Sequence, residues 1–184
     1  MAELTIVFYP EPILRTKGEG VRVFGQPLRA LAEDMLVAMR AARGMGLAAP
    51  QIGKSIQFFI VNVPDEDTPI ELDGKVVLDA KSIMPVYMAN AEVDILPGEI
   101  DLLEEGCLSF PGIRGEVPRV ERCVVRYRDV DGAPHVMVCG GLLARCIQHE
   151  HDHCQGVLFI DRMTVSHRQR AESKIKQLVR SAKA

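Results

Sequence analysis

Apolar residues recur in three segments at the three- and four-residue spacing of an amphipathic helix. In residues 27–44 these positions are Leu28, Leu31, Met35, Leu36 and Met39. Pro27 suits the first turn of this predicted helix and Gly44 suits its C-terminal cap, because proline needs no N–H partner and glycine tolerates a left-handed backbone. Further helices are predicted over residues 141–155 and, with a thin stripe of Ile175, Leu178 and Val179, over residues 164–184.

Other segments read as strands. Residues 55–64, SIQFFIVNVP, are rich in Phe, Ile and Val and predict a buried strand. Asp-Gly pairs stand between apolar arms at Asp73-Gly74 and Asp131-Gly132, which predicts two β-hairpins. Strands with a later helix packed among them favour an α+β fold in one domain over residues 1–184. Residues 64–82 are the expected loop or hairpin excursion.

Composition narrows the function classes. The 184 residues carry a net charge of −3 and a pI near 6.0, which disfavours a nucleic-acid-binding protein. No apolar stretch approaches the roughly 20 residues of a membrane span, and the N-terminus lacks an export signal, so we expect a cytoplasmic protein. The odd number of cysteines, five, and the lack of an export signal disfavour a disulfide framework, and the absence of a CxxC pair disfavours a zinc ribbon. We expect most of them to be small buried hydrophobic residues.

Residues 148–156, QHEHDHCQG, contain the pattern H-E-x-x-H. His149 and His153 are four residues apart, so on a helix they share one face and can reach one metal ion. Glu150 lies on the adjoining flank, where it can approach a metal-bound water. His151 points to the other side, and Asp152 is free to accept a hydrogen bond from a nearby donor. The pattern favours a metal site, and its alternative is an amphipathic helix whose histidines are core or surface residues.

A metal site needs a third ligand. The longer metzincin pattern fails, because Phe159 stands at its next ligand position. Residues 104–112, EEGCLSFPG, offer Cys107; one thiolate and two imidazoles would leave a tetrahedral position open for water. Cys107 by itself would be read as a buried structural thiol. Residues 44–51, GMGLAAPQ, offer small residues for close backbone approach and one amide side chain, Gln51.

Taken in order, GMGLAAPQ, EGCLS and QHEHDH closely resemble the three signature motifs of peptide deformylases, with Leu108 after the cysteine as in the bacterial type. The resemblance extends through IVFYPEPILR and LLARCIQHE…GVLFIDRM to nearly the whole chain. It implies mixed or antiparallel sheets packed around a central helix carrying HEHDH, with a C-terminal helix. It also implies hydrolytic removal of the N-formyl group from the initiator methionine of new polypeptides, by attack of a metal-bound hydroxide on the formyl carbonyl.

The resemblance assigns roles to particular residues. Cys107, His149 and His153 would bind one divalent metal ion, Fe(II) in the cell, with zinc, nickel or cobalt able to substitute. Glu150 would be the general acid and base, while Gln51 and the backbone N–H of Leu108 would hold the oxyanion. The substrate-binding positions would be Met45, Gly46, Gly106, Leu142, Arg145 and Cys146. Three residues depart from the family pattern without removing a catalytic group: Ala91, His151 and Cys154.

Basic residues crowd the C-terminal segment: Arg168, Arg170, Lys174, Lys176, Arg180 and Lys183. Their charge pattern suits a solvated helix face, whereas the resemblance suggests docking on the ribosome near the nascent chain. Two other functions stay open. A different metallopeptidase or amidase would take its third ligand from a downstream acid. A non-catalytic zinc module would have a closed site of four protein ligands, with His151 or Cys154 recruited.

Overall fold

The structure is a computed structural model, and it describes residues 4–182. The helices are α1 Gln26–Ala41, α2 Gly141–Cys154, α3 Phe159–Arg162 and α4 Val165–Ser181, and the short 3-10 turns are η1 Pro12–Arg15, η2 Ala49–Ile52 and η3 Ala80–Ser82. The strands are β1 Gly46–Ala48, β2 Phe58–Val61, β3 Ile70–Leu72, β4 Lys75–Val77, β5 Val86–Ile95, β6 Ile100–Gly106, β7 Arg114–Val120, β8 Cys123–Arg128 and β9 Pro134–Cys139. Within the described range, no helix has the length and apolar character needed to span a membrane.

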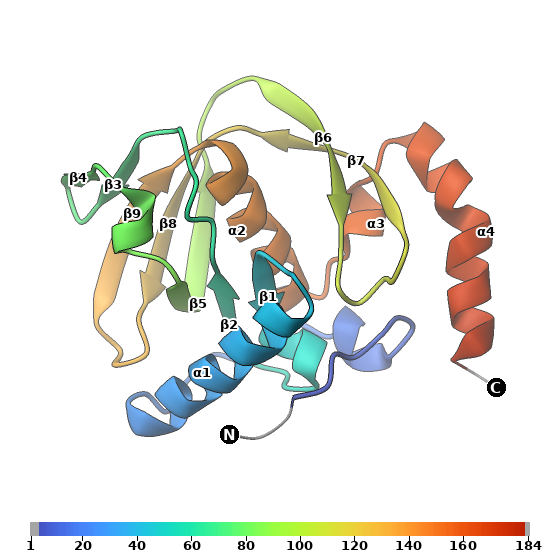
Figure 1. Cartoon of the computed structure of the whole chain (residues 1–184), viewed down its shortest axis with the longest axis horizontal. Coiled ribbons are helices and arrows are strands. Elements are labelled where there is room, and N and C mark those ends of the chain that lie inside the picture. Colours follow the sequence, from blue (N-terminus) through green and yellow to red (C-terminus); the bar gives the residue numbers. More distant parts are fainter. Residues whose placement is uncertain (1–3, 183–184) are drawn as a thin grey trace.

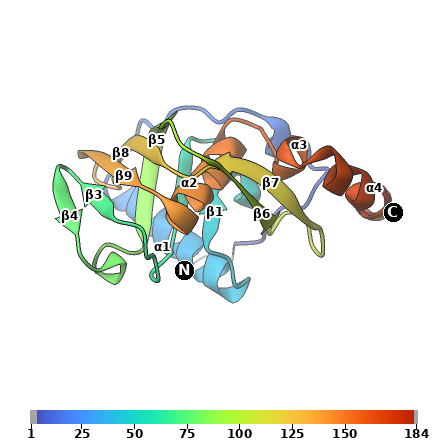
Figure 2. The same ribbon diagram turned by 90° about the horizontal axis from the view of Figure 1, so that it is seen from above.

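Two sheets surround the helix α2. The larger has seven strands in the order β1-β2-β5-β8-β9-β3-β4, and the smaller is the pair β6-β7; all of these strand pairs are antiparallel. α2 lies between them in the middle of the molecule (Figure 1). The β3–β4 hairpin and α4 lie at opposite ends (Figures 1 and 2). The predicted α+β class, with antiparallel sheets around a central helix and a C-terminal helix, is confirmed.

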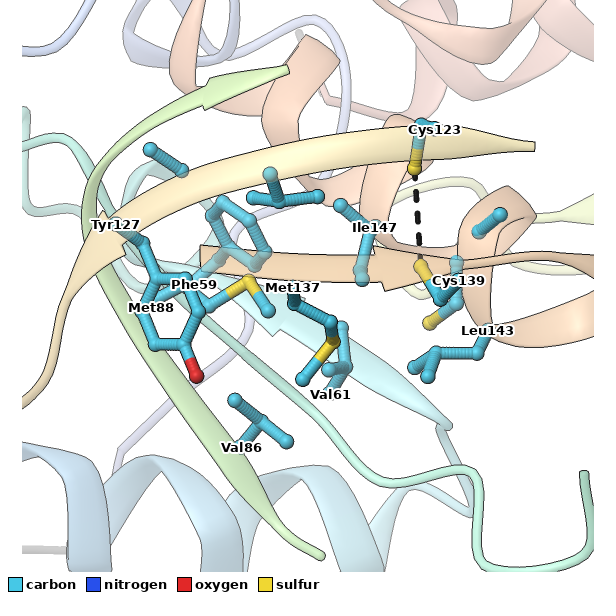
Figure 3. Close-up of a cluster of buried hydrophobic side chains, with 14 of the residues drawn as sticks. Phe59, Val61, Val86, Met88, Cys123, Tyr127, Met137, Cys139, Leu143 and Ile147 are labelled. Carbon is cyan, nitrogen blue, oxygen red and sulfur yellow. Dashed lines mark hydrogen bonds between the residues drawn. The ribbon is translucent and has the colours of Figure 1, made fainter. Parts of the chain in front are cut away.

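The largest part of the core packs α2 against the seven-stranded sheet. Leu143 and Ile147 of this helix are fully buried against side chains of the large sheet, among them Phe59 of β2 and Met137 of β9 (Figure 3). A second apolar cluster joins α1 to β1 and β2. A third packs α3 and α4 near the β6–β7 pair. The helix with the H-E-x-x-H pattern is therefore anchored to the large sheet.

Several sequence predictions hold. The predicted helices correspond to α1, α2 and α4, and the strand SIQFFIVNVP contains β2, which is buried throughout. Asp73 and Gly74 have positive φ angles of 51° and 75°, as a tight hairpin turn requires, and they join β3 to β4 within the predicted excursion. β8 and β9 form the second hairpin. Four cysteines are buried as expected: Cys123, Cys139, Cys146 and Cys154.

The predicted cap of α1 is wrong. The helix ends at Ala41, and Arg43, not Gly44, takes the left-handed conformation, with φ 56°. The Arg43 N–H donates to the Arg40 carbonyl and the Gly44 N–H to the Met39 carbonyl, which is a Schellman ending. Gly44 has a different reason to be glycine: a Cβ there would lie 2.8 Å from Leu108 Cδ1. The glycine thus lets the chain pass close to the residue after Cys107.

Candidate active site

α2 and the segment after β6 bring three metal-ligand side chains together. His149 and His153 lie one turn apart on α2, with ring centroids separated by 5.1 Å. Cys107 follows the last residue of β6, and its Sγ lies 3.2 Å from His153 Nε2. The ligand atoms of these three residues all lie within 4.8 Å of one another. One sulfur and two imidazole nitrogens can therefore surround a single ion.

The chemistry of this cluster fits a divalent transition metal. A thiolate and two imidazoles suit iron, zinc, nickel or cobalt better than magnesium or calcium. Burial, together with His149 and Arg119, lowers the pKa of His153 well below its usual range, so its ring is in the neutral form that binds metals. Nδ1 of His149 is hydrogen-bonded to Glu105, at 2.9 Å, which leaves Nε2 for the ion. Three protein ligands leave one position of a tetrahedral site open.

Glu150 has the environment of a proton-transfer group. It is 4% exposed, it lines a cavity of about 460 Å³, and its Oε2 has no hydrogen-bond partner among the described residues. Burial raises the pKa of its carboxyl to about 7. Such an acid can both accept and release a proton near neutral pH. Gly46 of β1 passes directly against it, since a Cβ on Gly46 would lie 2.4 Å from Glu150 Oε1.

Gln51 is fixed with its amide nitrogen toward the cysteine. Its Oε1 accepts a 2.8 Å hydrogen bond from the Ala48 N–H, while Nε2 lies 3.5 Å from Cys107 Sγ and 3.3 Å from Ser109 Oγ. The side chain is 1% exposed. Because the carbonyl oxygen is engaged on the other side, the N–H donors face the metal-ligand cluster.

The remaining predicted residues gather around the same cavity. Every site residue predicted from the sequence lines it except His153, which is buried beside Cys107. Arg145 is the unexpected one, because its guanidinium is engaged within the protein. It donates to Glu105 at 2.8 Å and to the carbonyls of Val117 and Asp101 at 2.9 Å each. Its charge is therefore committed to joining α2 to the β6–β7 pair.

The structure adds a buried ionic network that sequence reasoning missed. Glu105 accepts hydrogen bonds from Arg119, at 2.6 and 3.1 Å, in addition to its contacts with Arg145 and His149. Arg119 also donates to Asp152 at 3.0 Å, and Asp152 accepts from Arg162. Glu105, Arg119 and Asp152 are each less than 10% exposed. The expectation that Asp152 satisfies a nearby donor is met by these two arginines.

This network fixes the charge of Glu105. Burial alone would raise the pKa of the carboxyl, but hydrogen bonds from His149 and Arg119 outweigh burial and lower it to about 2. The ionised carboxylate holds Nδ1–H of His149 and so orients the ring with Nε2 toward the ligand atoms of Cys107 and His153. A signal was present in the sequence, since Glu105 stands two residues before Cys107 in EEGC.

The family model for polypeptide deformylase matches residues 3–169. The chain belongs to this family. The curated peptide deformylase of Opitutus terrae is 48% identical, over 98% of this chain and 95% of its own length. That of Methylacidiphilum infernorum is 35% identical, over 96% and 93%. A crystal structure of Plasmodium falciparum peptide deformylase has a TM-score of 0.83 at 32% identity and covers 97% of both chains. The plant peptide deformylase PDF1B has a TM-score of 0.86, also at 32% identity.

Membership of the deformylase family settles the reaction. The chain is a metal-dependent hydrolase that removes the N-formyl group from the initiator methionine of nascent polypeptides. The two alternative functions lose their support. The third ligand candidate comes from upstream, at Cys107. His151 lies beside Gln155, at 3.3 Å, and Cys154 Sγ lies 3.6 Å from the Phe58 carbonyl, so neither approaches the cluster as a fourth ligand.

Proposed function

We propose that Cys107, His149 and His153 bind one divalent ion, Fe(II) in the cell, and that zinc, nickel or cobalt can take its place. The proposal is supported by the approach of one sulfur and two ring nitrogens within 4.8 Å and by the preference of thiolate ligands for transition metals. When bound, the ion would act as a Lewis acid that polarises the formyl carbonyl and lowers the pKa of the attacking water. Glu105 holds His149 in the orientation that this binding needs.

Glu150 moves the proton in this proposal. Its carboxylate takes a proton from the attacking water and delivers it to the leaving nitrogen of methionine, which must not depart as an anion. The burial of Glu150 and its pKa of about 7 support both halves of this task. Because Gly46 has no side chain, the substrate backbone can approach the carboxylate closely.

Two donors stabilise the charge that forms on the formyl oxygen. Gln51 Nε2 and the N–H of Leu108 are directed to this oxygen, and the bond from Ala48 keeps the Gln51 amide from turning. Loss of one oxyanion donor in other enzymes costs roughly 2.7–4 kcal/mol in the transition state. Gly46 and Gly106 bind the peptide backbone, and the wall of the methionine pocket is formed by Met45, Leu142, Arg145 and Cys146.

The observation that carries these assignments is the clustering of Cys107, His149 and His153, with Glu150 lining the same cavity as Cys107 and His149. They are tested with protein prepared anaerobically with Fe(II) and with formyl-Met-Ala-Ser as substrate. Cys107→Ala should lose both metal and turnover, whereas Cys123→Ala, which alters a buried thiol that does not line the cavity, should keep both. A Cys107→Ala protein that binds metal as tightly as the parent would remove Cys107 from the ligand set.

Glu150→Gln separates proton transfer from metal binding. The amide keeps the shape of the side chain but cannot exchange a proton at neutral pH, so metal content should be unchanged and turnover should fall by several orders of magnitude. Metal content is measured by elemental analysis and turnover by release of formate. A variant with nearly full activity would show that another group carries the proton.

We further propose that the enzyme works in the cytoplasm as one catalytic domain and that α4 docks on the ribosome. Ala171 and Ile175 of α4 are buried in the third apolar cluster, so the helix is part of the domain. Its exposed basic residues are Arg170, Lys174, Lys176 and Arg180; Lys183 lies outside the described residues. Since truncation would expose the buried side chains, neutralising the charges is the sharper experiment.

The docking test replaces Arg170, Lys176 and Arg180 by glutamine. Ribosome co-sedimentation should weaken, and more so at higher salt, while hydrolysis of soluble formyl-Met-Ala-Ser should be unchanged. A matched control replaces three exposed basic residues in the N-terminal part of the chain, Lys17, Arg22 and Lys54. Equal binding by the two triple variants would show that α4 is not the docking surface.

A further inference from the structure

α2 begins without a side-chain cap of its own. Its N-cap residue is Gly140, no side chain of that residue can bond the first-turn amides, and the first turn contains no acidic residue. The free N–H groups and the positive end of the helix dipole call for an acceptor from elsewhere. This matters for the reaction, because the same helix carries His149, Glu150 and His153 further along.

Glu66, from the segment between β2 and β3, supplies that acceptor. Its Oε2 accepts a 2.7 Å hydrogen bond from the Leu143 N–H in the first turn of α2. Its Oε1 accepts a 3.0 Å hydrogen bond from the Thr68 N–H. One carboxylate therefore joins the helix to the 64–68 segment and at the same time fixes the local turn of that segment.

The Glu66–Thr68 turn packs closely against the two glycines at the start of α2. A Cβ on Gly140 would lie 2.4 Å from Thr68 Cγ2, and a Cβ on Gly141 would lie 2.5 Å from Glu66 Oε1. Gly141 also has a φ of +54°, which other residues adopt with strain. The two glycines make room for the Glu66–Thr68 turn directly on the end of the helix.

Leu142 is flanked by the two residues that Glu66 contacts, Gly141 and Leu143. Its side chain, 38% exposed, lines the active-site cavity. Arg145 and Cys146 follow one turn later on the same wall. A shift of the first turn would move Leu142 more than it would move His149 or Glu150, because those residues lie two turns further into the anchored part of α2.

We propose that Glu66 is a positioning residue for the substrate side chain: it caps α2 and thereby sets the Leu142 wall of the pocket. The inference rests on the proposed assignment of Leu142 to the methionine pocket. It places the determinant of side-chain selectivity partly outside the three motifs, in the 64–82 excursion. Glu66 acts through Leu143 and Leu142 and does not itself touch the substrate.

The test compares Glu66→Ala, Glu66→Gln and the parent, all loaded with nickel, on formyl-Met-Ala-Ser and formyl-Ala-Ala-Ser. For Glu66→Ala we expect a KM for the methionine substrate raised about tenfold with kcat changed less than twofold, the pattern of a lost ground-state and transition-state contact. The preference for methionine over alanine should fall by a similar factor. Glu66→Gln keeps an acceptor oxygen and should restore most of both.

The control is Asp67→Ala, which removes an exposed acid from the same turn and should leave both substrates unaffected. Thermal unfolding of every variant shows whether the fold is intact. An unchanged methionine preference in Glu66→Ala would overturn the inference, as would an equal loss of kcat on both substrates that Glu66→Gln does not restore. Lack of deformylation by the parent would instead count against the proposed catalytic roles.

Discussion

Glu105→Gln tests whether the ionic network behind His149 holds this proposed metal ligand in place. The carboxylate of Glu105 accepts hydrogen bonds from His149, Arg119 and Arg145 at distances between 2.6 and 3.1 Å, and the residue is 7% exposed. Glutamine has nearly the same volume but no charge, and one of its two oxygens becomes an NH₂ group. The substitution therefore removes a counter-charge and puts a donor opposite other donors, without creating a cavity.

Two arguments give the size of the effect. A carboxyl pKa lowered from 4.5 to about 2 corresponds to about 3 kcal/mol of stabilisation of the ionised, folded form. Removal of one partner from a buried ion pair typically costs about 3–5 kcal/mol. We therefore expect the free energy of unfolding at pH 7 to fall by about 3 kcal/mol. Because His149 is a proposed metal ligand, loss of its hydrogen bond to Glu105 should weaken metal affinity by about 10–100-fold.

The pH dependence has a definite sign. Since folding lowers the pKa of Glu105, its contribution is fully present above the unfolded value near 4.5 and is lost as pH falls toward 2. Urea unfolding of the metal-free proteins between pH 7 and pH 3 should thus show a stability gap between parent and variant that narrows only below about pH 4.5. Competition with a chelator measures the metal affinity of each.

Glu104→Gln is the matched control. Glu104 is the neighbouring acid, but its pair with Arg114 is exposed on both sides, so its loss should cost under about 1 kcal/mol and leave metal affinity unchanged. Equal stability and equal metal affinity in the two variants would refute the reasoning, because the buried network would then contribute no more than a surface ion pair.

Three further predictions follow from the same structure. An iron-loaded enzyme should lose activity in air faster than a nickel-loaded one, because a thiolate on Fe(II) invites oxidation; equal half-lives in a timed formate assay would contradict this. Gly46→Ala should lower kcat at least about tenfold, since its Cβ would displace Glu150, whereas Gly20→Ala, with 3.6 Å to the nearest atom, should not. Burial lowers the pKa of His135, but Asp73 and Asp129 outweigh burial and raise it above its usual value near 6.5. The difference in unfolding free energy between the parent and His135→Gln should therefore be full below pH 6.5 and shrink as pH rises. A difference that grows with pH in urea unfolding would contradict this sign.

The helices were predictable because their apolar periodicity is regular, whereas β5 and β6 were not. Asn90 in β5 has a positive φ of 53°, and the pairing with β8 shifts register between Ala89 and Glu92, which breaks the alternation of a strand. In β6 the usual pattern is inverted: Leu102 and Leu103 are 53% and 45% exposed, while Glu105 is buried. Sequence analysis recognises a strand by apolar residues on its buried face and polar residues on its exposed face. A strand that buries a charged residue beside the active-site cavity does not show this alternation.

Sequence analysis missed the ionic network at the site for one physical reason, which is the burial of α2. The spacing of His149 and His153 is local, so it predicted that they share one face of the helix, but α2 is buried on nearly all sides and not on one stripe. Most buried charged groups on such a helix take a partner from a distant segment. Arg119 and Glu105 fill that role for Asp152 and His149, and no spacing along the chain encodes these pairs. Two buried side-chain atoms of the described residues keep no partner, Glu150 Oε2 and His153 Nδ1, and both belong to the H-E-x-x-H pattern. Buried charges with hydrogen-bond partners therefore mark what holds α2, and these two buried atoms without a partner lie where we propose that its chemistry takes place.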